Sequence, residues 1–412
     1  MLKKIKINTK KQLAYNLLDN AFSKKDIMEG IKVLKSKKIT MSEKTKKFEI
    51  AFAKYVGAKY AIMVNSGSSA NLLSVFAACN PMRKNRFAKG EEAIVPSLCW
   101  STSLWPLVQA GLKPVFVDTD PKTLNMDIKD LKRKISTKTK VIMSVHVLGI
   151  SANISEIKKI SKKRNIILIE DTCESLGAEY NKKKLGTFGD FGTYSFYYSH
   201  QITSGEGGMI VCNNYNDYKI LHSMRSHGWS RGINENFKLK TKYKKLDKRF
   251  LFINSGFNLR PLDISAAIGH NQLKRIKKFI KTRNDNREKL INCIKKSKKW
   301  KDQFEFIVPN KKIIPSWFGL PILIDKKFIS IKQKFLKYLE KNKIENRPII
   351  SGNFINQPCI ELFKLNNKQS YFHGSEEIEK RGFFIGIHTK KINKNMLKYL
   401  TNKLLNINSF LK

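Results

Sequence analysis

The chain has 412 residues, 41% of them hydrophobic and 10% aromatic, so it is long enough for two globular domains. Its 80 lysines and arginines against 33 acidic residues give a formal charge of +47. These charges are spread along the whole chain, whereas a nucleic-acid binder more often gathers them on one arm or face. The six cysteines form no CxxC pair, which argues against a zinc site or a redox dithiol.

The amino-terminal half predicts alternating strands and helices. Residues 1–27 are rich in lysine and are expected to form an arm packed on the body. Residues 42–55 have helical periodicity, and a Ser/Gly turn then joins a strand at 61–65 to a helix at 70–79. Further apolar strands are predicted at 93–96, 114–118, 141–145, 166–171, 191–197 and 209–212, with amphipathic segments such as 153–164 between them. This alternation predicts an α/β fold with a mainly parallel sheet covered on both faces.

The carboxy-terminal part predicts a smaller domain. Residues 261–296 are expected to form one long helix that begins near Pro261 and leads away from the sheet. An apolar stretch at 313–324, a helix near 331–341 and a strand at 382–387 predict an α+β unit. We therefore expect an arm at 1–27, a large domain at 28–285 and a small domain at 286–412.

Sheets of this kind bind ligands where their parallel strands end. The turn Ser66-Gly67-Ser68 would offer helix N–H groups to an anion, although an ordinary capped helix fits it equally well. Asp171 and Glu174 end a strongly apolar strand and suit a metal ligand, a catalytic acid or a partner for a protonated ring nitrogen. A lone His200 would more often be a loop residue than a base, and a solvated turn is the alternative for the two carboxylates.

Two segments carry a resemblance to a known family: SHQITSGEGG at 199–208 and ENRPIISGN at 345–353. From about Gly30 to its end, the chain resembles the DegT/DnrJ/EryC1/StrS sugar aminotransferases, which use pyridoxal phosphate (PLP). Members of that family carry, where His200 stands here, a lysine that binds the cofactor covalently, but this chain has no lysine from 185 to 218. It is thus more similar to the nucleotide-sugar 3-dehydratases, a branch with histidine at that place. The absence of cysteine from 213 to 292 favours the colitose-pathway type over the iron–sulfur type.

The resemblance implies an aspartate-aminotransferase-like fold of type I, with a large PLP-binding domain and a small C-terminal α+β domain. It also implies cofactor-binding roles for Ser66, Gly67, Ser68, Trp100, Asp171, Glu174, Ser195 and Asn258. Asp171 would face the ring nitrogen, Glu174 the ring hydroxyl and Trp100 the ring plane, although unaided a tryptophan at this place is more often core. Aminotransferases more usually have glutamine where Glu174 stands. Asn258 would reach a neighbouring subunit's site, which implies a homodimer with shared sites.

The substrate-binding candidates are His227, Arg347, Asn353 and His388, and no metal site is predicted. The resemblance implies a dehydratase acting on a nucleotide-linked 4-keto-6-deoxyhexose such as GDP-4-keto-6-deoxymannose, in deoxysugar and lipopolysaccharide O-antigen synthesis. His200 would be its catalytic base, PLP or pyridoxamine phosphate (PMP) would bind non-covalently, and L-glutamate would restore PMP. The chain shows neither a signal peptide nor a long apolar run, so we expect a cytoplasmic protein without a membrane partner.

Two other functions are compatible with parts of the sequence. A nucleotide-sugar aminotransferase would share the cofactor contacts but needs the missing lysine. A basic nucleic-acid-binding regulator would use the +47 charge but has no need of Asp171, Glu174 or His200.

Overall fold

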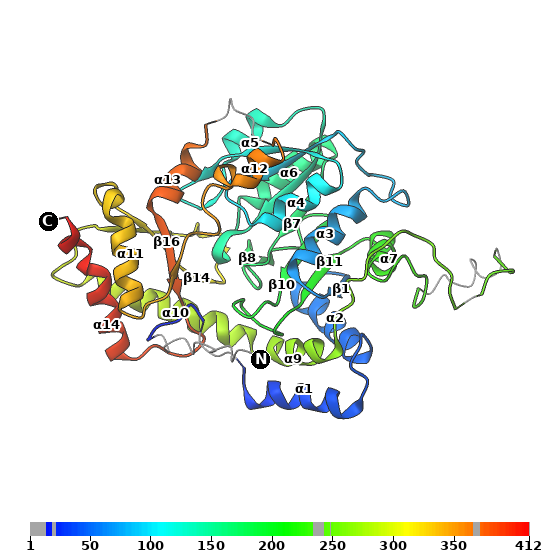
Figure 1. Ribbon diagram of the computed structural model, residues 1–412, viewed down its shortest axis with the longest axis horizontal. Coiled ribbons are helices and arrows are strands. Elements are labelled where there is room, and N and C mark those ends of the chain that lie inside the picture. The colour runs from blue at the N-terminus through cyan, green and yellow to red at the C-terminus, as the bar shows by residue number, and fades with distance from the viewer. Residues whose placement is uncertain (1–13, 19–21, 234–242, 248, 366–370, 412) are drawn as a thin grey trace, which may run out of the picture.

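The computed structural model describes residues 14–18, 22–233, 243–247, 249–365 and 371–411 (Figure 1). Its main sheet has seven strands in the order β1-β11-β10-β7-β6-β2-β3. Their bounds are β1 (Tyr60–Val64), β2 (Glu92–Pro96), β3 (Lys113–Val117), β6 (Thr139–Val145), β7 (Ile167–Asp171), β10 (Phe191–Ser195) and β11 (Gly208–Cys212). Strand β11 is antiparallel to both neighbours and the other pairs are parallel, so the predicted mainly parallel sheet is confirmed.

Helices cover both faces of this sheet because successive side chains on its strands point to opposite sides. Their bounds are α2 (Glu43–Val56), α3 (Gly67–Ala78), α4 (Ser101–Gln109), α5 (Ile128–Lys134), α6 (Ile154–Arg164), α7 (Tyr215–Met224) and α9 (Asp263–Leu273). On β1, Ile62 and Val64 pack in the cluster that includes residues of α3, α4 and α7. Met63 faces the opposite way, toward α2 and α9. The large domain is therefore a three-layer α/β/α structure (Figure 1).

The predicted single helix at 261–296 is wrong in one respect, because the structure has two helices there. Helix α9 begins at Asp263, after Pro261, and α10 (Ile276–Lys295) follows a break at Lys274 and Arg275. At the break, the Arg275 guanidinium pairs with the buried carboxylate of Asp26 in α1 (Lys24–Ser36), so a tertiary contact accompanies the interruption.

The small domain contains a four-stranded antiparallel sheet in the order β12-β14-β16-β15. Its elements are β12 (Phe304–Phe306), β14 (Gly319–Ile324), β15 (Asn346–Arg347), β16 (Gly382–Gly386), α11 (Lys332–Lys341), α12 (Pro358–Leu362), α13 (His373–Arg381) and α14 (Lys394–Leu405). Short strands elsewhere are β4 (Thr119–Asp120), β5 (Asn125–Met126), β8 (Glu179–Tyr180), β9 (Lys183–Lys184) and β13 (Ile313–Ile314). The 3-10 turns are η1 (Val147–Gly149), η2 (Lys326–Ile331), η3 (Phe354–Asn356) and η4 (Asn406–Phe410). The predicted 313–324 stretch is divided into β13 and β14, with Pro315 between them.

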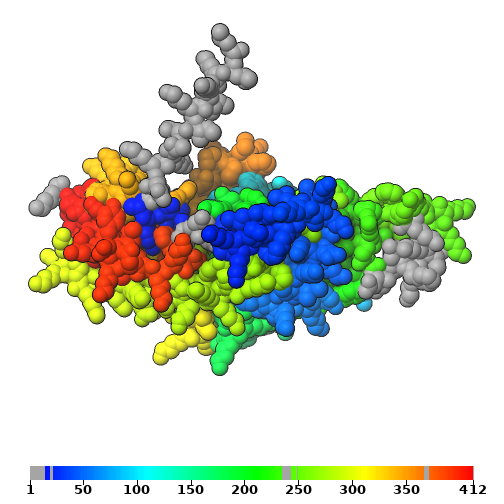
Figure 2. Space-filling view, turned by 90° about the horizontal axis from the view of Figure 1, so that it is seen from below, coloured from blue at the N-terminus to red at the C-terminus, as the bar shows by residue number. Residues whose placement is uncertain are grey.

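The described part of the amino-terminal arm lies on the small domain. Tyr15 donates its N–H to Lys343 O (2.9 Å), accepts from Glu345 N (3.0 Å) and stacks on His388 at 4.2 Å. Figure 2 shows these dark-blue residues beside the red carboxy-terminal segments. Helix α1 runs through the first predicted domain boundary, at 27/28, and α10 through the second, at 285/286, so the exact division stays a prediction. None of the described helices is long and apolar enough to span a bilayer.

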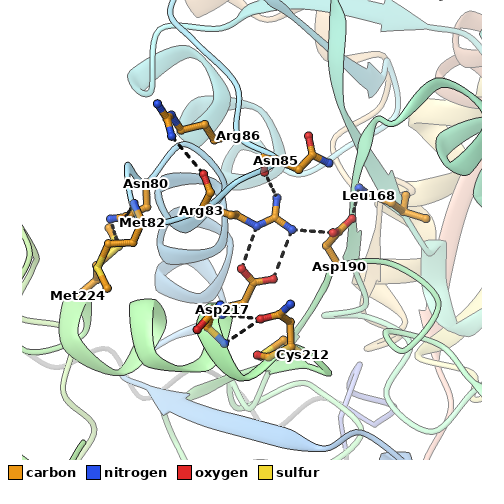
Figure 3. A network of polar contacts seen from close by, with 12 residues as sticks. Asn80, Met82, Arg83, Asn85, Arg86, Leu168, Asp190, Cys212, Asp217 and Met224 are labelled. Carbon is orange, nitrogen blue, oxygen red and sulfur yellow. Dashed lines mark hydrogen bonds and ion pairs between the residues drawn. The ribbon is translucent and has the colours of Figure 1, made fainter. Parts of the chain in front are cut away.

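A buried ion-pair network ties the sheet to its helices (Figure 3). Arg83, in the loop after α3, pairs with Asp217 of α7 (2.9 Å) and with Asp190 (2.6 Å), which precedes β10. Asp190 also accepts the N–H of Leu168 at the start of β7 (2.9 Å). The network therefore fixes the end of the sheet where these two strands begin.

Candidate active site

The carboxyl ends of the parallel strands form one edge of the large domain. Ser66 follows β1, Ser97 follows β2, Asp171 ends β7 and Ser195 ends β10. Since these strands run the same way, the turns that the sequence singled out meet at this edge, as predicted.

Asp171 is 5% exposed and is held by three donors. Its Oδ2 accepts from Asn71 Nδ2 (2.8 Å) and Ser103 Oγ (2.7 Å), and its Oδ1 accepts from Cys173 N (3.1 Å). Asn71 Oδ1 in turn accepts from Thr193 Oγ1 at 2.6 Å. Sequence reasoning missed Asn71, Ser103 and Thr193. The signal that could have found Asn71 is an amide on the otherwise apolar face of α3.

The start of α3 forms a cradle beside this carboxylate. Ser66 caps the helix, with its Oγ accepting from Ser69 N at 3.0 Å, and Gly67 begins it. A Cβ on Gly67 would lie 2.5 Å from Ser195 Cβ and 3.1 Å from Cys173 Sγ, so only glycine fits there. The N–H groups of Gly67 and of exposed Ser68 have no acceptor within the helix and suit an anion. A phosphate cradle next to a buried carboxylate fits a phosphorylated pyridine cofactor.

His200 lies in the loop between β10 and β11 and is half-buried. Its Nδ1 is buried and has no hydrogen-bond partner among the described residues. Burial, together with the charge of Arg283, lowers the pKa of His200 to about 3. The imidazole is therefore neutral at neutral pH.

Glu174 follows Asp171 by three residues and accepts the Leu148 N–H on Oε2 at 3.0 Å. Burial raises the pKa of Glu174 to about 7; the N–H of Leu148 opposes this and the charge of Asp171 adds to it. The carboxyl is thus a mixture of protonated and ionised forms near neutral pH. In its protonated form it can donate a hydrogen bond, as a glutamine amide would.

Glu170 and His146 form a buried pair next to Asp171 that was not singled out by sequence reasoning. Glu170 is fully buried and accepts the N–H groups of Gly186 (2.9 Å), Phe188 (2.6 Å) and Gly189 (2.7 Å). It also lies 3.2 Å from His146 Nε2, while His146 N donates to Asp171 O at 3.0 Å. The pair therefore supports the strand end that carries Asp171.

Trp100 precedes α4 and is 58% exposed, so it is not a core residue. Three residues later, Ser103 binds Asp171, which places the indole on the same edge of the sheet. Its stacking role stays a prediction.

Asn258 and His227 lie on neighbouring segments, joined by the bond from the His227 N–H to Phe257 O (2.8 Å), and outside the hydrogen-bond network of Asp171. Asn258 accepts from Arg260 Nε at 3.0 Å and pairs with Ser226 in a β-bridge. It lines a groove of about 1050 Å³ beside α2 and α7. His227 is exposed, with a left-handed backbone (φ 61°). Within the described chain, neither side chain hydrogen-bonds to the Asp171 network.

The candidates in the small domain have different surroundings. Arg347 is exposed and pairs with Glu345 at 3.0 Å. Asn353 is buried, and the N–H of the next residue, Phe354, donates to Ser97 O at the end of β2 (2.8 Å). His388 Nε2 contacts Asn16 O at 2.8 Å, so the arm engages it. Among the described residues, no cluster of three His, Cys, Asp or Glu side chains could hold a metal ion.

Comparison with known proteins agrees with this geometry. The model of the DegT/DnrJ/EryC1/StrS aminotransferase family matches residues 21–404. GDP-4-keto-6-deoxy-D-mannose 3-dehydratase of Escherichia coli O55:H7 is 42% identical over 86% of this chain and 90% of its own length. The Yersinia pseudotuberculosis enzyme of the same name is 37% identical over 94% of this chain and 96% of its own length.

Solved structures agree as well. The E. coli GDP-4-keto-6-deoxy-D-mannose 3-dehydratase with bound hydrated PLP has a TM-score of 0.86 at 37% identity, over 96% of this chain and 100% of its own. A structure of the same kind of enzyme with a trapped PLP–glutamate adduct has a TM-score of 0.84 at 37% identity, over 95% and 100%. The predicted type I fold of PLP-dependent enzymes is thus confirmed. The chain belongs to the DegT/DnrJ/EryC1/StrS aminotransferase family.

Proposed function

We propose that this chain is a PLP/PMP-dependent dehydratase that removes the 3-hydroxyl of GDP-4-keto-6-deoxymannose or a close relative, in deoxysugar and O-antigen synthesis. The observation that carries the proposal is His200, which stands where the aminotransferases have their lysine, in a stretch from 185 to 218 without lysine. The two relatives compared over most of the chain bear the name of this dehydratase.

In this proposal, the first turn of α3, with Ser66, Gly67 and Ser68, and Ser195 hold the cofactor phosphate. Asp171 keeps the ring nitrogen protonated, and Glu174 contacts the ring hydroxyl. When bound, the cofactor supplies an electron sink for cleavage of the carbon–oxygen bond at carbon 3.

His200 moves the proton in this reaction. Its neutral imidazole accepts a proton at a ring nitrogen and then gives it to the departing 3-hydroxyl, which leaves as water. A single group can perform both steps because it regains its neutral form after the second. Asn353 and Arg347 are the small-domain candidates for the sugar and its phosphates.

The electron balance requires a donor. Loss of the 3-oxygen is a two-electron reduction of the sugar, and oxidation of L-glutamate to 2-oxoglutarate with release of ammonia supplies those electrons. The relative with a trapped PLP–glutamate adduct supports glutamate in this role. No external reductase is then needed.

We further propose a homodimer with shared sites, in which Asn258 and His227 act on the neighbouring subunit. Their separation from the Asp171 network within one chain supports this arrangement. We also propose a cytoplasmic location, because the six cysteines are free thiols and nucleotide sugars are the substrates.

The test is incubation with PLP, L-glutamate and a panel of nucleotide 4-keto-6-deoxysugars, read by mass spectrometry. A product lacking the 3-oxygen, together with 2-oxoglutarate, is expected with the GDP-mannose derivative. A 4-amino sugar would instead support the alternative, a nucleotide-sugar aminotransferase.

Cofactor attachment separates the same two functions. Histidine cannot tether the cofactor as lysine does, so after borohydride treatment and denaturation the cofactor should be released. Peptide mapping that finds a stoichiometric phosphopyridoxyl-lysine on one peptide would overturn the dehydratase proposal.

A further inference from the structure

The imidazole of His200 is oriented by packing. A catalytic histidine is usually held by a hydrogen bond from its second ring nitrogen. In the described structure His200 Nδ1 has no such partner. Its ring meets Phe318 edge to face, with centroids 5.2 Å apart and an interplanar angle of 82°. Among the described residues, Tyr197 is a second ring neighbour, at 6.0 Å, but it is 49% exposed and less constrained.

Phe318 is itself anchored at both its backbone and its ring. Its N–H donates to Leu148 O at 3.1 Å, and the N–H of Leu148 donates to Glu174 Oε2 at 3.0 Å. The backbone of Leu148 therefore bonds both to Phe318, which lies against His200, and to Glu174 of the same site. On its other side, the Phe318 ring meets Phe384 of β16 at 5.9 Å.

The neighbouring residues support this anchor. Gly319 leaves room for Phe384, because a Cβ there would lie 2.5 Å from the Phe384 ring. Gln201, next to His200, donates its Nε2 to the carbonyl oxygens of Glu174 and Ser316. Hydrogen bonds therefore join the loop that carries His200, the loop that carries Glu174 and the segment before β14 next to the Phe318 ring.

We propose that Phe318 is the positioning residue of His200, and that its ring fixes the imidazole in the orientation needed for proton transfer. The role of His200 as base belongs to the proposed function, on which this inference rests. Phe318 directly precedes β14 of the small domain. The packing of that domain against the Leu148 turn therefore also determines the orientation of the His200 imidazole.

The central test compares Phe318→Leu, which keeps apolar bulk, with Phe318→Tyr, which keeps the ring. With the loaded enzyme, Phe318→Leu should lower kcat tenfold or more at little change in KM, since a base misplaced by about 1 Å can cost about 100-fold. Phe318→Tyr should retain kcat within about threefold, an expectation that follows from the preserved ring contact. Crystal structures of the cofactor-free proteins should show one imidazole orientation in the parent and the Tyr variant, and a rotated or divided one in Phe318→Leu.

Phe304→Leu is the matched control, because Phe304 is a buried small-domain ring that contacts neither His200 nor Phe318 in the described structure. It should leave kcat and the imidazole unchanged. Should Phe318→Leu fail to fold, Phe384→Leu releases the Phe318 ring from behind and should show the same effect at smaller size.

The inference is overturned if Phe318→Leu keeps kcat within about twofold with its imidazole in place, or if Phe304→Leu loses as much. If the parent enzyme does not turn over the GDP sugar, the proposed function fails. The cofactor-free structures would still decide whether Phe318 positions His200.

Discussion

Replacement of Glu174 by glutamine should make the cofactor-free protein more stable at alkaline pH. Burial raises the pKa of Glu174 from 4.5 to about 7, so the folded chain binds this proton more tightly than the unfolded chain. Folding stability therefore falls as pH rises from 4.5 to about 7, and the loss is complete above that range. At about 1.4 kcal/mol per pH unit, the shift from 4.5 to about 7 corresponds to about 3 kcal/mol of unfolding free energy. Glutamine keeps an oxygen for the Leu148 N–H and carries no charge.

The assay is urea unfolding of the cofactor-free parent and Glu174→Gln proteins from pH 4.5 to 8.5. The unfolding free energy of the variant minus that of the parent should grow by about 2–3 kcal/mol across this range and level off above pH 7. His200 has its pKa lowered to about 3 and costs stability below pH 6.5, but it is present in both proteins and cancels. A difference between the proteins that does not vary with pH would refute the reasoning.

Three further outcomes are expected. Asp171→Asn should fold and bind PLP but lose turnover by about 100-fold or more, because the ring nitrogen loses its charged partner; near-normal turnover at saturating cofactor would contradict its assignment. Mixing inactive His200→Asn with inactive Asn258→Ala protomers should restore some activity, and no rescue after confirmed subunit exchange would count against shared sites. Arg83→Met should cost about 3–5 kcal/mol in urea unfolding, since it leaves Asp217 buried without its counter-charge (Figure 3), and the added change Asp217→Leu should recover part of it.

The sheet could be predicted because its strands are continuous apolar runs bounded by turn residues. The run at 166–171, for example, agrees with β7 to within one residue at its start. The strand-end positions of Ser66 and Asp171 follow from the same pattern, since parallel strands end at one edge. The functions of those positions did not follow from it, because a capped helix and a solvated turn give the same local sequence.

Other features depend on contacts between distant segments and leave no local signal. The break between α9 and α10 lies where Arg275 meets Asp26, almost 250 residues earlier in the chain. Asn71 and Ser103 converge on Asp171 from two helices, and neither residue type is distinctive alone. The sequence does not distinguish Phe318 from other apolar residues that precede a strand. Only the folded chain brings it against His200.

The two departures from the aminotransferase pattern, His200 for lysine and Glu174 for glutamine, are physically linked. Phe318 lies against His200 and donates its N–H to Leu148, whose own N–H donates to Glu174, so we expect a lysine at 200 to bring an ammonium into the surroundings of this carboxyl. A nearby opposite charge lowers a carboxyl pKa. With a neutral imidazole instead, burial and the charge of Asp171 keep the pKa of Glu174 at about 7. In the proposed site, the protonated acid donates a hydrogen bond to the ring hydroxyl, and it can do so only up to about neutral pH. A His200→Lys variant should therefore ionise Glu174, and the stability gain of Glu174→Gln at pH 8 should shrink in that background.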